Sequence, residues 1–138
     1  MDILKPMAGY SIHDAVVVIG FMNLMLSVVE FMRPDIWAGF WMRWAASRFF
    51  RFHGMVLVAI AAVLFAAQPV PNLEFGVWFI LLVMTVTGGA ILLKPARLSM
   101  AITEAYKNRG DDEIRRFTYS DAMFRVLVGL CLIFSVTG

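Results

Sequence analysis

Residues 75–93 form a continuous apolar run of 19 residues that contains no charged side chain. A helix of about 20 apolar residues crosses a hydrocarbon core about 30 Å thick, and such a helix satisfies its own backbone polar groups in lipid. Three further runs, 15–32, 50–67 and 120–137, reach a comparable length. With 61% hydrophobic residues the chain also lies far from the average soluble protein. The sequence therefore predicts an all-α membrane protein with four transmembrane helices.

The connections between these runs predict how the four spans are arranged. The segments 33–49 and 94–119 are polar and basic, whereas residues 68–74 form a short turn that contains two prolines. We expect the first and second spans to form one hairpin and the third and fourth another, within a single domain of residues 1–138.

Positive charge is concentrated in two parts of the sequence. Every lysine and arginine except Lys5 lies within 33–51 or 94–125. Because loops rich in lysine and arginine stay on the cytoplasmic side, both basic segments are expected to face the cytoplasm at a bacterial inner membrane. An even number of spans then places both termini on the outer, periplasmic side.

The segment 33–53, RPDIWAGFWMRWAASRFFRFH, combines tryptophan with arginine between two spans. Pro34 disfavours helical geometry at the residue before it, so a new helix is expected to begin there. Tryptophan and arginine are favoured at lipid headgroups, which predicts a short interfacial amphipathic helix on the cytoplasmic side. The alternative is a connecting helix whose tryptophans pack against a partner subunit. A second short helix is expected within 96–107. The predicted interface anchors share one face: Trp37, Trp41, Trp44 and Arg48.

The two halves of the chain have the same order of features. A shift of 61 residues places the Arg-Pro pair at 33–34 over the Lys-Pro pair at 94–95, and the first span over the third. Adding about eight residues places the second span over the fourth, with Phe65 over Phe134. This pattern favours an internal repeat with parallel orientation in the membrane. Convergence is the alternative, since any membrane hairpin of this kind needs a basic cytoplasmic loop.

Small and polar residues follow helical spacing in the first span. Gly20, Asn23 and Ser27 fall on one face, because their spacings are three and four. Polar groups that face lipid lack partners, so this stripe is expected to pack against another span. A polar transport path along the same face is the alternative. The expected partners in the third span are Thr85, Gly88 and Gly89.

Glu30 is an ionisable residue within the first span, where a carboxylate is costly unless it is paired or hydrated. Under the predicted topology it lies at the same membrane surface as several basic groups. We therefore expect an intramembrane polar cluster with a structural role, or with a proton-relay or quinone-headgroup role. Its predicted members are Glu30, Arg33, Arg51, His53 and Arg125.

Other chemistry has little support in the sequence. His13 and His53 begin different spans at opposite membrane surfaces, so they cannot ligate one haem. Cys131 is the single cysteine and lies inside an apolar run, which is typical of a buried structural thiol. No nucleophile motif or phosphate-binding glycine loop is present, so an enzyme is not expected. We predict no cofactor, and a bound phospholipid or quinone is the ligand that such a chain could hold.

Composition and layout favour a non-catalytic accessory subunit of a larger bacterial membrane complex, respiratory or photosynthetic. Its partners would be other membrane-protein subunits and anionic phospholipids, because short loops and apolar faces supply contact area and little else. A small homo-oligomeric transporter or channel, with a path along Asn23, Ser27 and Glu30, is the first alternative. A quinone- or lipid-binding membrane protein is the second. The net charge of +2 does not indicate nucleic-acid binding, since the basic residues flank the spans.

Overall fold

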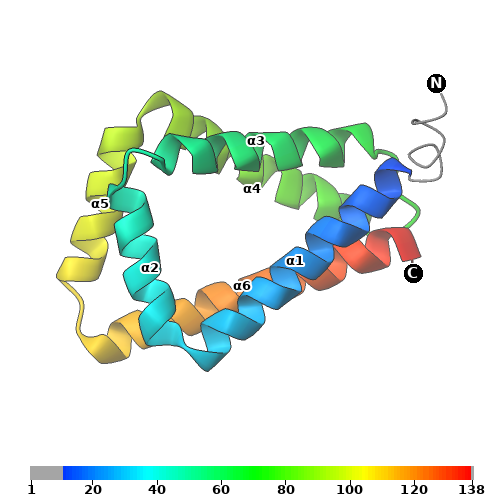
Figure 1. Ribbon diagram of the computed structural model, residues 1–138. Coiled ribbons are helices and arrows are strands. Elements are labelled where there is room, and N and C mark those ends of the chain that lie inside the picture. Colours follow the sequence, from blue (N-terminus) through cyan, green and yellow to red (C-terminus); the bar gives the residue numbers. More distant parts are fainter. Residues whose placement is uncertain (1–10, 138) are drawn as a thin grey trace, which may run out of the picture.

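The computed structural model describes residues 11–137, which form six helices (Figure 1). The all-helical class agrees with the prediction. In chain order the helices are α1 (Ile12–Met32), α2 (Pro34–Ala46), α3 (Phe50–Ala66), α4 (Glu74–Leu93), α5 (Pro95–Lys107) and α6 (Asp111–Thr137).

Three of these helices, α1, α4 and α6, are each long and apolar enough to cross a membrane. α3 has 17 residues and meets α2 at a bend of 102°, so the two count as a fourth span only when taken together. By helix length and hydropathy the chain is a multi-pass membrane protein. α6 begins nine residues before the predicted fourth span, because Asp111 and the acidic residues after it suit the positive end of a helix dipole.

Two turns with the same backbone geometry end α1 and α4. Arg33 has φ −139° and ψ 70°, and Lys94 has φ −136° and ψ 61°. In each case the next residue is a proline at the first position of the following helix, Pro34 in α2 and Pro95 in α5. Proline excludes helical geometry at the residue before it but is well suited to begin a helix. The two sequence pairs therefore make the same turn.

Helix pairing differs from the predicted hairpins. α1 packs along α6, and α3 packs along α4, while α1 and α3 make few contacts (Figure 1). A Cβ built on Gly20 would lie 2.9 Å from the carbonyl oxygen of Gly129, and one built on Gly88 would lie 2.9 Å from that of Gly54. Glycine thus allows close backbone approach in both pairs. The first hairpin does not form because α2, about 20 Å long, separates the ends of α1 and α3.

The two helix pairs converge at the end where α1 begins and α6 ends, which we call the apex (Figure 1). Its buried core takes Val16 from α1, Leu64 from α3, Val77 from α4 and Leu132 from α6. The Nε2 atom of His13 lies 2.9 Å from the carbonyl oxygen of Ala67, at the end of α3. The apex therefore joins all four long helices.

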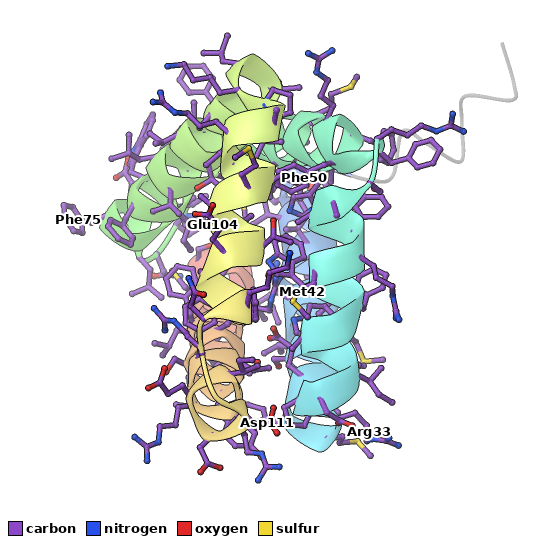
Figure 2. All side chains as sticks on the ribbon, turned by 90° about the vertical axis from the view of Figure 1, so that its left-hand side faces the viewer. Arg33, Met42, Phe50, Phe75, Glu104 and Asp111 are labelled. Carbon is purple, nitrogen blue, oxygen red and sulfur yellow. The ribbon has the colours of Figure 1, made fainter. Side chains whose placement is uncertain are left out.

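At the opposite end the two pairs diverge, and α2 and α5 lie side by side across the gap (Figures 1 and 2). In Figure 2, α2 runs upward from Arg33 toward Phe50, whereas α5 runs downward toward Asp111. The two short helices are therefore antiparallel. We call them the α2–α5 layer.

Burial follows the same pattern in both halves of the chain. Three of the four buried positions of α1 coincide with buried positions of α4 at an offset of 61 residues, and all four of α3 coincide with buried positions of α6 at an offset of 68. The predicted match of Phe65 with Phe134 is wrong by one residue, and a one-residue shift rotates a helix face by about 100°. Exchanging the halves converts the α1–α6 pair into the α4–α3 pair. Matched buried pairs are Val16 and Val77, Ser27 and Gly88, Glu30 and Ile91, Gly54 and Ala122, Leu64 and Leu132, and Ala67 and Ser135.

Candidate functional site beneath the α2–α5 layer

Glu30 lies in the last turn of α1 and has no solvent-exposed surface. It shares the buried face of this helix with Val16, Gly20 and Ser27, and the close contact of Gly20 with Gly129 sets that face against α6. Neither carboxylate oxygen of Glu30 makes a hydrogen bond with any residue of the described chain. A buried polar atom without a partner is rare and costly in native proteins, so this side chain needs an explanation.

Arg125 of α6 lies between two carboxylates. Its Nε atom donates a hydrogen bond to Oδ2 of Asp121 at 3.2 Å, one helical turn away. The same Nε atom lies 3.3 Å from Oε2 of Glu30, an ion pair without hydrogen-bond geometry. The guanidinium carbon lies 5.5 Å from the centroid of the Trp37 ring, so a cation–π contact holds it from the α2 side. The single guanidinium of Arg125 therefore interacts with two carboxylates, those of Glu30 and Asp121.

A cavity of about 200 Å³ opens at these groups. An adjoining cavity of about 110 Å³ shares Trp41, Tyr106 and Phe117 with it and extends to Arg109. We call the first one the Glu30 cavity. Its walls come from four helices and consist of Glu30, Trp37, Trp41, Tyr106, Phe117, Thr118, Asp121 and Arg125.

Tyr106, on α5, is the phenol of this cavity. Burial raises its pKa to about 12, the negative charges of Asp121 and Glu30 add to the rise, and Arg109 opposes it. The phenol is therefore neutral at physiological pH. Its hydroxyl adds a polar group to the cavity without adding charge.

The surroundings of Glu30 and Arg125 form one corner of the molecule, and the equivalent corner in the other half of the chain, where α4 packs along α3, is apolar. At offsets of 61 and 68 residues Ile91 stands in place of Glu30, and Leu57 in place of Arg125. Both belong to a packed apolar cluster that contains Ala45, Phe50 and Ile91 as its buried members. The same backbone arrangement is thus built once with charges and once without. Charged groups are thus present at only one of the two matched places in the described chain.

Two predicted members of the polar cluster meet, and three lie elsewhere. Glu30 and Arg125 are paired, whereas His53 lies behind the wall of the cavity, with its ring 5.1 Å from that of Trp41. Arg33 is exposed and pairs with Asp35 at 3.7 Å. Arg51 lines a separate surface hollow with Arg48. The expectation is wrong for Arg33, which lies at the break between α1 and α2, and for Arg51, which lies in the first turn of α3 after the break that ends α2.

Sequence reasoning missed Asp121 and Tyr106. The available signal was the spacing of four between Asp121 and Arg125, which places both on one face of a helix. Tyr106 had no comparable signal, since its position depends on how α5 crosses α6. The cavity is therefore a product of tertiary packing.

The predicted packing stripe does not join α1 to α4. Asn23 donates to the carbonyl oxygen of Ile19, and Ser27 to that of Leu24, both within α1. On α4, the hydroxyl of Thr85 donates to the carbonyl oxygen of Leu81 in its own helix, and within residues 11–137 nothing lies within 4 Å of a Cβ built on Gly89. Gly20 and Gly88 do make close contacts, with Gly129 and Gly54 respectively. The stripe was assigned the wrong partner because α1 packs along α6.

The three tryptophans of α2 pack against other residues of this chain and keep part of their surface exposed. All three are half-buried, and Trp37 and Trp41 line the Glu30 cavity. Trp44 packs against the apolar corner, and the guanidinium of Arg48 lies 5.0 Å from the ring centroid of Phe49. The outer face of α2 instead presents Phe40 and its exposed neighbours. The three tryptophans therefore share the inner side of α2, whereas Arg48, predicted on the same face, lies in the turn after α2 ends at Ala46.

Comparisons with protein-family models, curated proteins and solved structures gave no match. Within residues 11–137 no group of three or more histidine, cysteine, aspartate or glutamate side chains is placed to hold a metal ion. The site is therefore interpreted from its own chemistry: an aromatic cavity with two carboxylates, one guanidinium and one phenol.

Proposed function

We propose that this protein binds a small polar ligand in the Glu30 cavity, and that it acts as a binding or transport component and not as an enzyme. The observation that carries the proposal is the contrast between Glu30 and Ile91, which occupy equivalent buried positions. Packing alone is served by the apolar version of this corner. A carboxylate whose two oxygens accept no hydrogen bond from the described residues is suited to a ligand that donates hydrogen bonds.

Energetics support a functional role for the charges. Burying an ion costs several kcal/mol even after relaxation, and replacing a buried ion pair by apolar side chains is often neutral or stabilising by about 1–4 kcal/mol. The other half of the chain carries such a replacement in Leu57 and Ile91. A costly group at a position where a cheaper one fits is a mark of a functional site.

We also propose that the two halves are an internal repeat with parallel orientation. Three observations support it: the turns at Arg33 and Lys94 match, the helix pairs match, and buried positions match. In such a repeat, one copy of the corner has kept an apolar core, and the other has become the ligand site.

For the topology, we propose that the α2–α5 layer faces the cytoplasm of a bacterial inner membrane and that the apex lies at the periplasmic side. The concentration of lysine and arginine in and around this layer supports that orientation. Arg48 and Arg51, which line one surface hollow, are suited to anionic phospholipid headgroups. The ligand would then enter from the cytoplasm or from the inner leaflet.

Tryptophan fluorescence tests the binding function directly, since Trp37 and Trp41 line the cavity. Detergent-solubilised protein is titrated with phosphatidylethanolamine, phosphatidylglycerol and decylubiquinone, which represent two lipid headgroups and a quinone. We expect a saturable change with at least one probe that is weakened in Glu30→Gln and retained in Asp35→Asn, a carboxylate on the exposed side of α2. If no probe gives a Glu30-dependent response, the proposed function is wrong.

A second function, the accessory subunit, is favoured by the outer surface of α4. Thr85 and Gly89, four residues apart, are turned away from the rest of the described chain, and a Cβ at Gly89 would meet nothing within 4 Å. Small residues at this spacing allow close contact with a partner helix in a membrane. Purification in mild detergent, with and without Gly89→Leu, tests it. Foreign subunits retained by the native chain and lost from the variant would support this role, and a bare monomer in both would contradict it.

A further inference from the structure

We infer that the ligand of the Glu30 cavity is an organic ammonium group that carries N–H donors, and that one proton takes its place when the site is empty. This inference rests on the proposed binding function and names the chemical class of the ligand. It is drawn from charge balance, hydrogen-bond capacity and the aromatic walls of the cavity.

Charge balance comes first. Among residues 11–137, the groups that face Glu30 are Asp121 and Arg125 from α6 and the neutral phenol of Tyr106 from α5. Arg109 borders the adjoining cavity and is not among the residues that line the Glu30 cavity, and its guanidinium carbon lies 5.7 Å from the centroid of the Phe117 ring. The ring of His53 packs against that of Trp41 and does not line the Glu30 cavity. Two carboxylates against one guanidinium leave one negative charge in excess. Asp121 is 39% exposed and reaches water, whereas Glu30 is fully buried and shares its guanidinium with Asp121. A buried carboxylate that is only partly balanced is unfavourable, so a cation or a proton at Glu30 would stabilise the site.

Hydrogen-bond capacity selects among cations. The Nε proton of Arg125 is given to Asp121, so Glu30 receives charge from this guanidinium but no hydrogen bond from Nε. Its two oxygens need donors, and a primary ammonium offers three. A quaternary ammonium has the same charge and no donor. The site should therefore prefer an N–H-bearing cation.

The walls and size of the cavity fit a compact organic ion. Aromatic ring faces attract cations, and Arg125 already lies over one of them, Trp37. Trp41 and Tyr106 border both adjoining cavities. The volume of about 200 Å³ is smaller than the roughly 300–1,000 Å³ typical of drug-sized ligands. A headgroup or a short alkylamine is of suitable size.

Proton exchange follows from the same balance. When the ammonium leaves, a proton on the Glu30–Asp121 pair restores neutrality, and the carboxyl O–H supplies the missing donor. When an ammonium group binds again, the carboxyl group gives that proton to water. No bond other than O–H changes, and no oxidation or reduction is involved. Binding of the cation should therefore release about one proton and should weaken as pH falls.

The test uses the full chain in nanodiscs of phosphatidylglycerol, which contain no ammonium headgroup. Butylammonium and butyltrimethylammonium serve as matched probes, with equal charge and the same alkyl chain. Tryptophan fluorescence measures binding, and a pH indicator in weak buffer measures proton release from the unmodified protein, so that the second readout needs no variant. A parallel arm replaces part of the lipid by phosphatidylethanolamine, which distinguishes a lipid headgroup from a free amine.

We expect butylammonium to bind more tightly than butyltrimethylammonium by about tenfold, which corresponds to about 1.4 kcal/mol. Its binding should release about one proton, and Glu30→Gln and Asp121→Asn should weaken it while Asp35→Asn leaves it unchanged. Competition from phosphatidylethanolamine would assign the site to the lipid, and no competition would assign it to a free amine. Equal binding of both probes, or binding without proton release, would overturn the inference. A Glu30-dependent response to decylubiquinone or phosphatidylglycerol but not to butylammonium would overturn it as well and leave the proposed function standing.

Discussion

Glu30 and Ile91 occupy equivalent buried positions in α1 and α4, 61 residues apart, and only one of them is charged. Arg125 and Leu57, at the equivalent positions of α6 and α3, differ in the same way. The molecule therefore contains a charged and an apolar version of one corner. This relationship makes it possible to separate what the charges do for stability from what they do for ligand binding.

The first prediction concerns replacement of the charged pair, Glu30 and Arg125, by the side chains of the apolar pair. Arg125→Leu should lower the free energy of unfolding by about 3 kcal/mol, because Glu30 is left buried without its partner. Glu30→Ile combined with Arg125→Leu copies the apolar corner and should recover most of the loss. Thermal unfolding in detergent compares the variants. If the double variant is as unstable as Arg125→Leu alone, the apolar pair does not stabilise this corner, and the prediction is wrong.

The second prediction concerns glycine contacts between helices. Gly20→Ala should destabilise the protein by about 1–3 kcal/mol, because the added Cβ would lie 2.9 Å from the carbonyl oxygen of Gly129. Gly89→Ala is the matched control in α4, where no described residue lies within 4 Å of the added Cβ. It should be neutral or stabilising, by up to about 1 kcal/mol, since alanine favours helix. Melting temperatures of both variants test this, and equal losses would contradict the pairing of α1 with α6.

The third prediction concerns orientation in the membrane. In a Cys131→Ser background, Asn72→Cys lies in the turn between α3 and α4, and Asp112→Cys lies at the start of α6. A maleimide that does not cross membranes should label position 72 in intact cells and position 112 only after permeabilisation. Labelling of both positions in permeabilised cells is the control. The reverse pattern would show that the α2–α5 layer faces outward and would contradict the charge rule for this chain.

The fourth prediction concerns alkaline pH. The pKa of Tyr106 is raised from 10.0 to about 12 in the folded protein. Between these values the unfolded chain loses the phenol proton and the folded chain keeps it, so stability should fall as pH rises through this range. Tyr106→Phe should flatten that dependence. Unfolding in detergent at several pH values measures it, and an unchanged slope in the variant would show that the phenol is not buried beside the carboxylates.

Local signals account for what the sequence could predict about the fold. Hydropathy and length identify α1, α4 and α6, because a chain in lipid has to satisfy its backbone within each helix. Proline after Arg33 and Lys94 ends α1 and α4 by a clash confined to two residues. The similarity of the two halves is also visible in sequence, although burial in the structure gives an offset of 68 residues for the second helix pair.

By itself, the sequence determined that the chain forms membrane-spanning helices and where α1 and α4 end, since hydropathy and the clash before proline depend on neighbours along the chain. Only the tertiary structure decided that α1 pairs with α6, because that choice depends on the fit between Gly20 and Gly129, which are far apart in sequence. The candidate site has the same origin. Asp121 and Tyr106 become its walls only when α5 and α6 pack around Glu30, and the energy of burying a charge is set by what surrounds it in space.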